Sequence, residues 1–187
     1  ERIERILHGL EQGMDIALVS DAGTPLISDP GYPLVRAVIE AGLRVIPVPG
    51  ASSIIAALCA SGLPADHFSF HGFLAHKKSQ RLAQLQAITQ LRGTQLVLEP
   101  THRILNRLEQ IAEVMPDADL VLAKELTKQH ERFIRGNAEL CLQQLTADPQ
   151  LKKGEFVVLI HLQQPRQADS LQIDSKQLLQ RLLQDLP

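Results

Sequence analysis

Four polar segments of this sequence follow apolar runs, and their side chains could bind a ligand or move a proton. The longest, 21–31, comes directly after the apolar run 16–19 and holds two glycines, two prolines, a threonine, a serine and two aspartates. Such residues stop a strand and supply backbone N–H groups, hydroxyls and carboxylates. A second loop, 49–53, follows the short predicted strand 44–48. Because open α/β sheets bind ligands at the carboxyl ends of their strands, the two loops predict one cleft.

A tight turn is the competing interpretation of each loop. For 49–53 alone, a turn with Ser52 as a helix cap is the better explanation. The loop 21–31 is harder to explain in this way, since it is about twice as long as an ordinary connection of roughly 2–6 residues. Additional loop at this edge of a sheet usually serves a function.

The other two segments carry most of the ionisable groups. Glu-Pro-Thr-His-Arg (99–103) follows the predicted strand 95–98 and begins a helix, where anions are favoured; a capped helix start explains it equally well. The segment 124–131 begins where the strand 120–123 ends, although a run of charges is usually a solvated face. Together they place carboxylates, imidazoles and cationic groups where two predicted strands end, which favours a functional site.

Several classes of site lack support. His67 and His71 are four residues apart, but on a predicted strand and not on a helix, and no cysteine pair accompanies them, so no metal is expected. Walker, Gly-x-Gly-x-x-Gly and Gly-x-Ser-x-Gly motifs are absent from the sequence. The net charge of −2 and the aromatic content of 3% argue against a uniformly basic or base-stacking nucleic-acid binder. A basic surface would have to be local.

Two further expectations concern the location of the protein and the burial of its cysteines. No apolar run approaches the ~20 residues of a membrane helix, and no signal segment opens the sequence, so we expect no membrane association and a cytoplasmic location. Cys59 and Cys141 lie in apolar segments and are expected to be buried.

The elements that must position these residues alternate between strand and helix, which predicts an α/β fold. Strands are expected at 16–20, 44–48, 67–73, 95–98, 120–123, 132–135 and 156–160, and helices at 1–13, 32–41, 53–60, 79–91, 101–114, 137–145 and 176–186. Turn residues near 62–66 suggest a first α/β domain at 1–64 and a second at 65–163, followed by a linker and the start of a helical extension at 164–187. Two strands are too few for a parallel sheet, so either strands of the second half join them or an N-terminal segment is absent.

The order of the motifs resembles the tetrapyrrole-methylase superfamily. They are Ser-Asp-Ala-Gly-Thr-Pro-Leu-Ile-Ser-Asp-Pro-Gly (20–31), Pro-Gly-Ala-Ser-Ser (49–53), Gly-Phe-Leu (72–74), Glu-x-x-His-Arg (99–103), Glu-Leu-Thr-Lys-x-x-Glu (125–131) and Gly-Glu-Phe-Val-Val (154–158). The resemblance implies two α/β domains of the class III methyltransferase type, with a parallel sheet in the first and a mixed sheet in the second. It also implies that the first domain is incomplete at its N-terminus, and that the protein is a homodimer.

Within this superfamily the motifs are most similar to a branch that methylates the ribose 2′-hydroxyl of a cytidine in small-subunit ribosomal RNA. The resemblance implies S-adenosylmethionine as cofactor, no metal, and the RNA or the small ribosomal subunit as partner. The expected cofactor-binding residues are Asp21, Ala22, Gly23, Thr24, Pro25, Ser28, Asp29, Pro49, Gly50, Ala51 and Ser52.

The same resemblance implies catalytic and substrate-binding positions. The expected catalytic residues are Glu99, His102, Glu125 and Lys128, with Glu125 or His102 as the base, and the expected substrate-binding residues are Arg103, Lys124, Thr127 and Glu131. Further basic residues, Lys77, Lys78 and Arg81, follow a third strand and could extend a phosphate-binding surface. Two alternatives remain: a methylase of a tetrapyrrole, and a fragment that binds without catalysis.

Overall fold

A computed structural model describes residues 1–21 and 23–163. Its centre is a five-stranded sheet in the order β1-β2-β5-β3-β4. β1 (Phe68–Phe73) pairs in parallel with β2 (Thr94–Pro100). The antiparallel pairs join β2 to β5 (Glu155–His161), β5 to β3 (Asp119–Lys124), and β3 to β4 (Arg132–Gly136). The mixed sheet expected for the second half of the chain is therefore confirmed.

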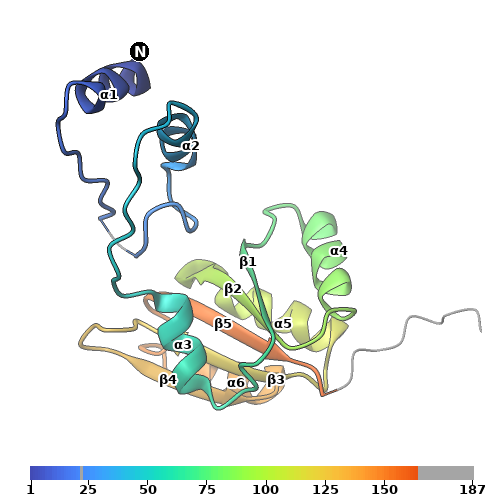
Figure 1. The fold of residues 1–187 in the computed structure, drawn as a ribbon. Helices are drawn as coiled ribbons and strands as arrows, with labels where there is room; N and C mark the ends of the chain where they lie inside the picture. Colours follow the sequence, from blue (N-terminus) through green and yellow to red (C-terminus); the bar gives the residue numbers. More distant parts are fainter. Residues whose placement is uncertain (22, 164–187) are drawn as a thin grey trace, which may run out of the picture.

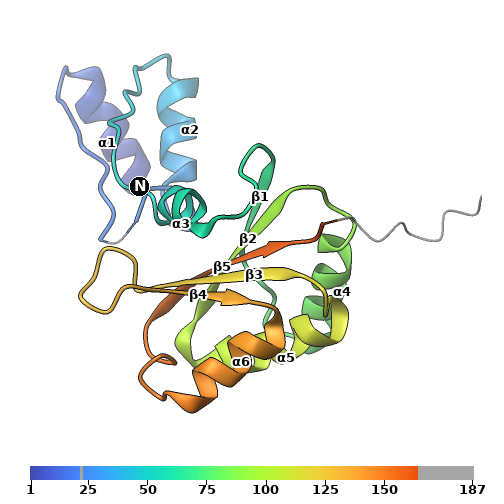
Figure 2. The same ribbon diagram turned by 90° about the horizontal axis from the view of Figure 1, so that it is seen from below.

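Helices cover both faces of this sheet (Figures 1 and 2). α4 (Lys78–Ile88), α5 (Ile104–Val114) and α6 (Ala138–Ala147) lie on one face, and α3 (Ser53–Ser61) lies on the other. The three central strands are apolar on both sides, as expected for a sheet that is buried between two layers. One cluster of buried side chains joins the sheet to α4–α6, and a second joins it to α3.

Hydrogen bonds fix several of these elements at their ends. The Asn137 side chain accepts the N–H of Leu140 at 2.9 Å and so caps α6. Arg135 of β4 donates from Nε to the carbonyl of Ser61 at 3.1 Å and from Nη2 to that of Ala60 at 2.7 Å. A cation at the last carbonyls of a helix is favourable, so Arg135 ties the end of α3 to the sheet.

The first part of the chain contains two more helices, α1 (Arg2–Glu11) and α2 (Tyr32–Glu40), which lie beside each other away from the sheet (Figure 1). The predicted strands 16–20 and 44–48 are wrong for the described residues, because both segments lack regular secondary structure. A strand needs a hydrogen-bonded neighbour, and none of the strands in the described part of the chain pairs with either segment. Their apolar residues stay exposed instead, as at Val19 (80%) and Val48 (87%). The parallel sheet expected for this part is therefore absent from the described residues.

The other predicted elements within the described residues are confirmed, with ends shifted by up to three residues. The helix predicted at 101–114 begins with one 3₁₀ turn, η1 (Thr101–Arg103), before α5. The helix 176–186 and the linker before it lie outside the described residues. Cys141 is buried as expected, but Cys59 is exposed, because it lies on a face of α3 that the sheet does not cover.

Candidate functional site

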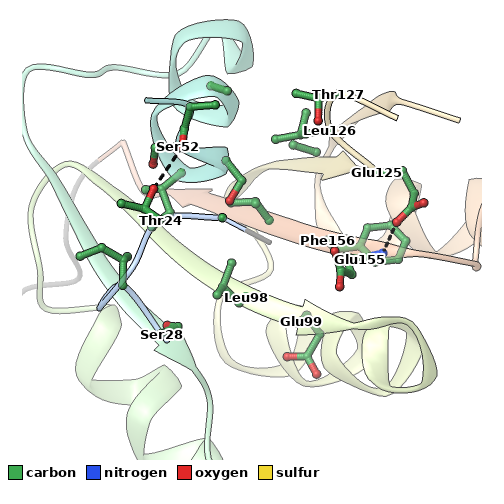
Figure 3. A pocket seen from close by; sticks show the side chains of 18 of the residues that line it. Thr24, Ser28, Ser52, Leu98, Glu99, Glu125, Leu126, Thr127, Glu155 and Phe156 are labelled. Atoms are coloured by element: carbon green, nitrogen blue, oxygen red, sulfur yellow. Dashed lines mark hydrogen bonds between the residues drawn. The ribbon is translucent and has the colours of Figure 1, made fainter. Parts of the chain in front are cut away.

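A cleft of about 490 Å³ lies between the first part of the chain and the sheet (Figure 3). One wall comes from the loop 21–31 and another from the segment that leads into α3. The Thr24 hydroxyl joins these two walls, because it donates a hydrogen bond to the carbonyl of Ala51 at 3.2 Å. The two loops that the sequence analysis assigned to one cleft thus lie together in the structure.

The floor of the cleft is apolar. Leu98 of β2 and Ala123 of β3 are both direct neighbours of Val157, which lies between them on β5. All three line the cleft, as do Phe73 and Leu126. An apolar floor bordered by a few polar groups is typical of sites for small organic ligands, and the volume of the cleft falls within their usual range of roughly 300–1,000 Å³.

The backbone around the cleft is strained. Among the described residues, the non-glycine residues with positive φ are Leu26 (72°), Ser28 (58°), Glu125 (49°) and Thr127 (65°). Two belong to the loop 21–31 and two to the segment after β3, and Ser28 lies across the cleft from Glu125 and Thr127 (Figure 3). Such conformations cost about 1–3 kcal/mol each and cluster at functional sites, which supports the assignment of the cleft as a site.

The segment after β3 is held over the cleft by a compact set of hydrogen bonds. The Glu125 carboxylate accepts the N–H of Glu155 at 2.8 Å and the Lys128 ammonium at 3.0 Å, and Lys128 also contacts the Glu155 carboxylate at 3.1 Å. The N–H of Glu155, and then Lys128, lower the pKa of Glu125, whereas Glu125 and Glu155 raise the pKa of Lys128. A carboxylate with a lowered pKa is a weaker proton acceptor.

Glu99 reaches the border of the cleft at the end of β2, but its carboxylate is buried. Arg107 of α5 donates from Nε and Nη2 to both carboxylate oxygens, at 2.6 and 3.0 Å. The side chains are only 1% and 2% exposed. Such a two-point ion pair fixes the orientation of both groups. Glu99 is thus an ion-pair partner and not a free carboxylate.

The structure brings about half of the expected site residues to the cleft. Those that line it are Gly23, Thr24, Ser28, Asp29, Ala51, Ser52, Glu99, Glu125, Thr127 and Lys128. Those that do not are Asp21, Pro25, Pro49, Gly50, His102, Arg103, Lys124 and Glu131, and Ala22 lies outside the described residues.

Three of the residues outside the lining have clear structural positions. Lys124 is 3% exposed and contacts the carbonyl of His130 at 3.5 Å, and strand alternation turns it away from the face of Ala123. His102 is exposed on η1 and accepts a hydrogen bond from Arg103 at 3.1 Å. Glu131 accepts the N–H of Thr127 at 2.7 Å and so shapes the segment that lines the cleft.

Sequence reasoning missed the apolar lining and one acidic group. Leu98, Ala123 and Val157 carry no chemical signal, and only the strand register reveals that they adjoin. Phe73 and Glu155 lie within the Gly-Phe-Leu and Gly-Glu-Phe motifs and could have been selected from them. In the described part of the chain, no cluster of three metal-binding side chains is found, and no helix is long and apolar enough to cross a membrane.

Comparison with curated proteins finds similarity along the whole chain. Proteins named ribosomal RNA small subunit methyltransferase I are 40% identical in Pasteurella multocida, over 100% of this chain and 67% of the relative, and 42% identical in Escherichia coli O157:H7, over 100% and 65%. The protein of this name in Haemophilus influenzae is 45% identical, over 86% of this chain and 57% of the relative. The chain thus spans between 57% and 67% of the length of these three relatives.

Solved structures and a family model give the same assignment of fold. The methyltransferase CobJ is 19% identical, with a TM-score of 0.62 over 87% of this chain and 70% of its own. Uroporphyrin-III C-methyl transferase from Thermus thermophilus, complexed with S-adenyl homocysteine, is 19% identical with a TM-score of 0.52 over 84% and 71%. The model of the tetrapyrrole (corrin/porphyrin) methylases matches residues 1–141. Motifs, fold and similarity together show that this chain belongs to the tetrapyrrole (corrin/porphyrin) methylase family.

Proposed function

We propose that this chain is part of an S-adenosylmethionine-dependent enzyme that methylates the ribose 2′-hydroxyl of a cytidine in small-subunit ribosomal RNA. The main support is the 40–45% identity to proteins named ribosomal RNA small subunit methyltransferase I, combined with a cleft that joins the motif loops. The Thr24–Ala51 hydrogen bond, which brings the loop 21–31 to the start of α3, is the structural observation on which the proposal depends most.

The residues of the cleft fit the cofactor. Apart from Glu99, whose carboxylate is paired with Arg107, its ionisable side chains are three carboxylates, Asp29, Glu125 and Glu155, and one ammonium, that of Lys128. A surplus of carboxylates favours a ligand with positive groups, and the apolar floor suits a flat ring system. Bound S-adenosylmethionine would supply an activated methyl group. The residues of the loop 21–31 and of 51–53 that line the cleft would hold it, and those at 125–128 would face the acceptor.

The chain must then orient the acceptor hydroxyl and remove its proton. Glu125 lines the cleft, whereas His102 does not, which favours Glu125 as the group near the reaction. Its lowered pKa argues against a strong base. We therefore assign Glu125 and Lys128 to the orientation of the hydroxyl, and keep His102 as the base if the RNA brings the hydroxyl to the rim of the cleft.

The substrate contacts are assigned to basic side chains at the rim. We assign the phosphate contacts to Arg103 on η1 and to the exposed Lys77 and Lys78 after β1, while Lys124 and Arg81 are too buried to make them. We further propose a cofactor-binding domain at 1–64, a substrate domain at 65–163, a homodimer, and a cytoplasmic location where ribosomal subunits are available.

Methyl transfer to defined RNA tests this proposal. The purified chain and a full-length relative are incubated with labelled S-adenosylmethionine and small-subunit RNA or whole subunits, and the modified nucleotide is mapped by mass spectrometry. We expect a label on one cytidine that disappears when its 2′-hydroxyl is replaced by hydrogen. A label on a tetrapyrrole and none on RNA would favour the alternative substrate, and calorimetry with S-adenosylmethionine identifies a chain that binds no cofactor.

A further inference from the structure

A buried polar network leads from the cleft to the basic turn after β1. It begins with the Glu99–Arg107 ion pair at the end of β2 and continues to Gln110 on α5, whose side-chain oxygen accepts from Arg107 Nη1 at 3.2 Å. The same oxygen accepts from Arg81 Nε of α4 at 2.6 Å. One amide oxygen therefore joins two buried arginines from two different helices.

Arg81 carries the network on to the turn 75–77. Its Nη1 donates to the carbonyl of Ala75 at 3.1 Å and to that of His76 at 2.8 Å. This turn directly follows Leu74 and the cleft-lining Phe73, and it leads into the exposed Lys77 and Lys78. The backbone that presents these two lysines is thus fixed by a guanidinium beneath it.

The network contains more positive than negative charge. It contains two buried guanidinium groups, because Arg81 is 8% and Arg107 is 2% exposed. Its carboxylate is that of Glu99, which accepts hydrogen bonds from Arg107. Burial, and then the nearby charge of Arg107, lower the pKa of Arg81. An unbalanced buried guanidinium is costly unless neutral oxygens accept its hydrogen bonds, and here the Gln110 amide oxygen serves both arginines. Position 110 therefore requires a side chain that can accept hydrogen bonds from both arginines.

We propose that Gln110 is a positioning residue that couples the end of β2 at the cleft to the turn 75–77, and so holds Lys77 and Lys78 ready for the phosphates of the RNA substrate. The last part of this inference rests on the proposed function, whereas the coupling itself does not. Gln110 is not among the residues that line the cleft, so we expect it to touch neither cofactor nor acceptor.

Two substitutions at this position separate hydrogen bonding from packing. Gln110→Leu keeps the approximate volume and removes the acceptor, while Gln110→Glu keeps an acceptor for both arginines. Ile111→Ala, at a fully buried neighbour in the core, is the control for a general loss of stability. Thermal unfolding of all variants shows how much global stability each one loses.

Limited trypsin digestion reports on the turn, because its cleavage sites include Lys77 and Lys78. We expect cleavage after these lysines to be about tenfold faster in Gln110→Leu, because the turn loses the equivalent of one charge-assisted hydrogen bond. In Gln110→Glu the rate of cleavage should stay within about twofold of that of the original chain. Ile111→Ala should accelerate cleavage at many sites without selecting the turn. Unchanged cleavage in Gln110→Leu, or equal acceleration in Gln110→Glu, would overturn the coupling.

Binding measurements test the role in substrate recognition separately. Gln110→Leu should weaken binding of a small-subunit RNA fragment about three- to tenfold and leave the affinity for S-adenosylmethionine unchanged, while Gln110→Glu restores RNA binding. If the original chain binds no RNA, the proposed substrate is wrong, and the digestion still decides on the coupling. If the turn loosens but RNA binding stays the same, the network does not serve recognition, and that part of the inference is overturned.

Discussion

The side chain of Glu125 accepts the backbone N–H of Glu155 at 2.8 Å, and the carbonyl of Glu155 accepts the N–H of Glu125 at 3.0 Å. The segment after β3 is thereby fixed to the first residue of β5. Gly154 allows this close approach, because a Cβ at that position would overlap the Glu125 side chain. The positive φ of Glu125 is thus held by contacts with the neighbouring strand, and that of Thr127 by the hydrogen bond from its N–H to the Glu131 carboxylate.

The stability of the chain should depend on pH through Glu125 and Lys128. The folded pKa of Glu125 is lowered, so its contribution is present above the unfolded pKa of about 4.3 and is lost as the pH falls through the folded value. The folded pKa of Lys128 is raised, so its contribution is present below about 10.4 and is lost as the pH rises through the folded value. Solvent screening limits each to about 1 kcal/mol or less, since Lys128 is half exposed.

Urea unfolding at a series of pH values measures this effect. Relative to the original chain, Glu125→Gln should lose stability at neutral pH and become less sensitive to pH between about 5 and 3. Glu113→Gln on α5, at an exposed carboxylate, is the control and should follow the original profile. Parallel profiles for Glu125→Gln and the original chain would show that the ionisation of Glu125 does not contribute to stability, and coincident profiles that its hydrogen bonds contribute nothing.

The Glu99–Arg107 pair should behave as one unit. Arg107→Met leaves the Glu99 carboxylate buried without its partner and should cost about 3–5 kcal/mol. The double variant Glu99→Leu, Arg107→Met removes both charges and should lose clearly less than the sum of the two single variants. Arg36→Met at the exposed Arg36–Glu40 pair is the matched control, and we expect no measurable loss of stability there because solvent screens the pair. Additive losses in a urea-unfolding cycle would contradict the coupling.

The two cysteines should differ in reactivity. Cys59 is exposed on α3, and Cys141 is buried on α6, where burial raises its pKa to about 11. Thiolate is the reactive form, so Ellman's reagent should titrate one thiol per folded chain quickly and the second only after unfolding. In Cys59→Ser the fast phase should be missing. A fast phase that persists in this variant would place Cys141 at the surface.

The sequence predicted the strands of the sheet because their apolar runs begin after clear turn residues, as after Pro116 and Asp117 for 120–123 and after Gly154 for 156–160. It failed for 16–20 and 44–48, because an apolar run shows that a segment can form a strand but not that a partner strand lies beside it. Cys59 was misassigned for a related reason: an apolar helix does not show which of its faces is covered.

The candidate site was predictable only in part. Loops rich in glycine, proline and hydroxyl groups indicated two walls of the cleft, because their composition excludes regular structure. Charged residues were less informative, since Lys124 and Glu99 carry the same charges whether they face the cleft or the core. The position of Arg107 eight residues after Glu99, which buries that carboxylate, is evident only from the packing of α5 on the sheet.

The hydrogen bond between Thr24 and Ala51 should control cofactor affinity. Thr24→Val keeps the shape of the side chain but removes the hydroxyl. The two walls of the cleft then lose the hydrogen bond of 3.2 Å between Thr24 and the carbonyl of Ala51. A hydrogen bond of this kind contributes about 0.5–1.5 kcal/mol, which corresponds to a loss of affinity for S-adenosylmethionine of about two- to tenfold by calorimetry. Thr24→Ser keeps the hydroxyl and should stay close to the original affinity.

Gly50→Val is a second comparison, because Gly50 does not line the cleft and a Cβ there meets only the carbonyl of Val48 at 4.0 Å. It should change the affinity less than Thr24→Val does. Equal affinities for Thr24→Val and the original chain would mean that the two loops do not bind the cofactor together.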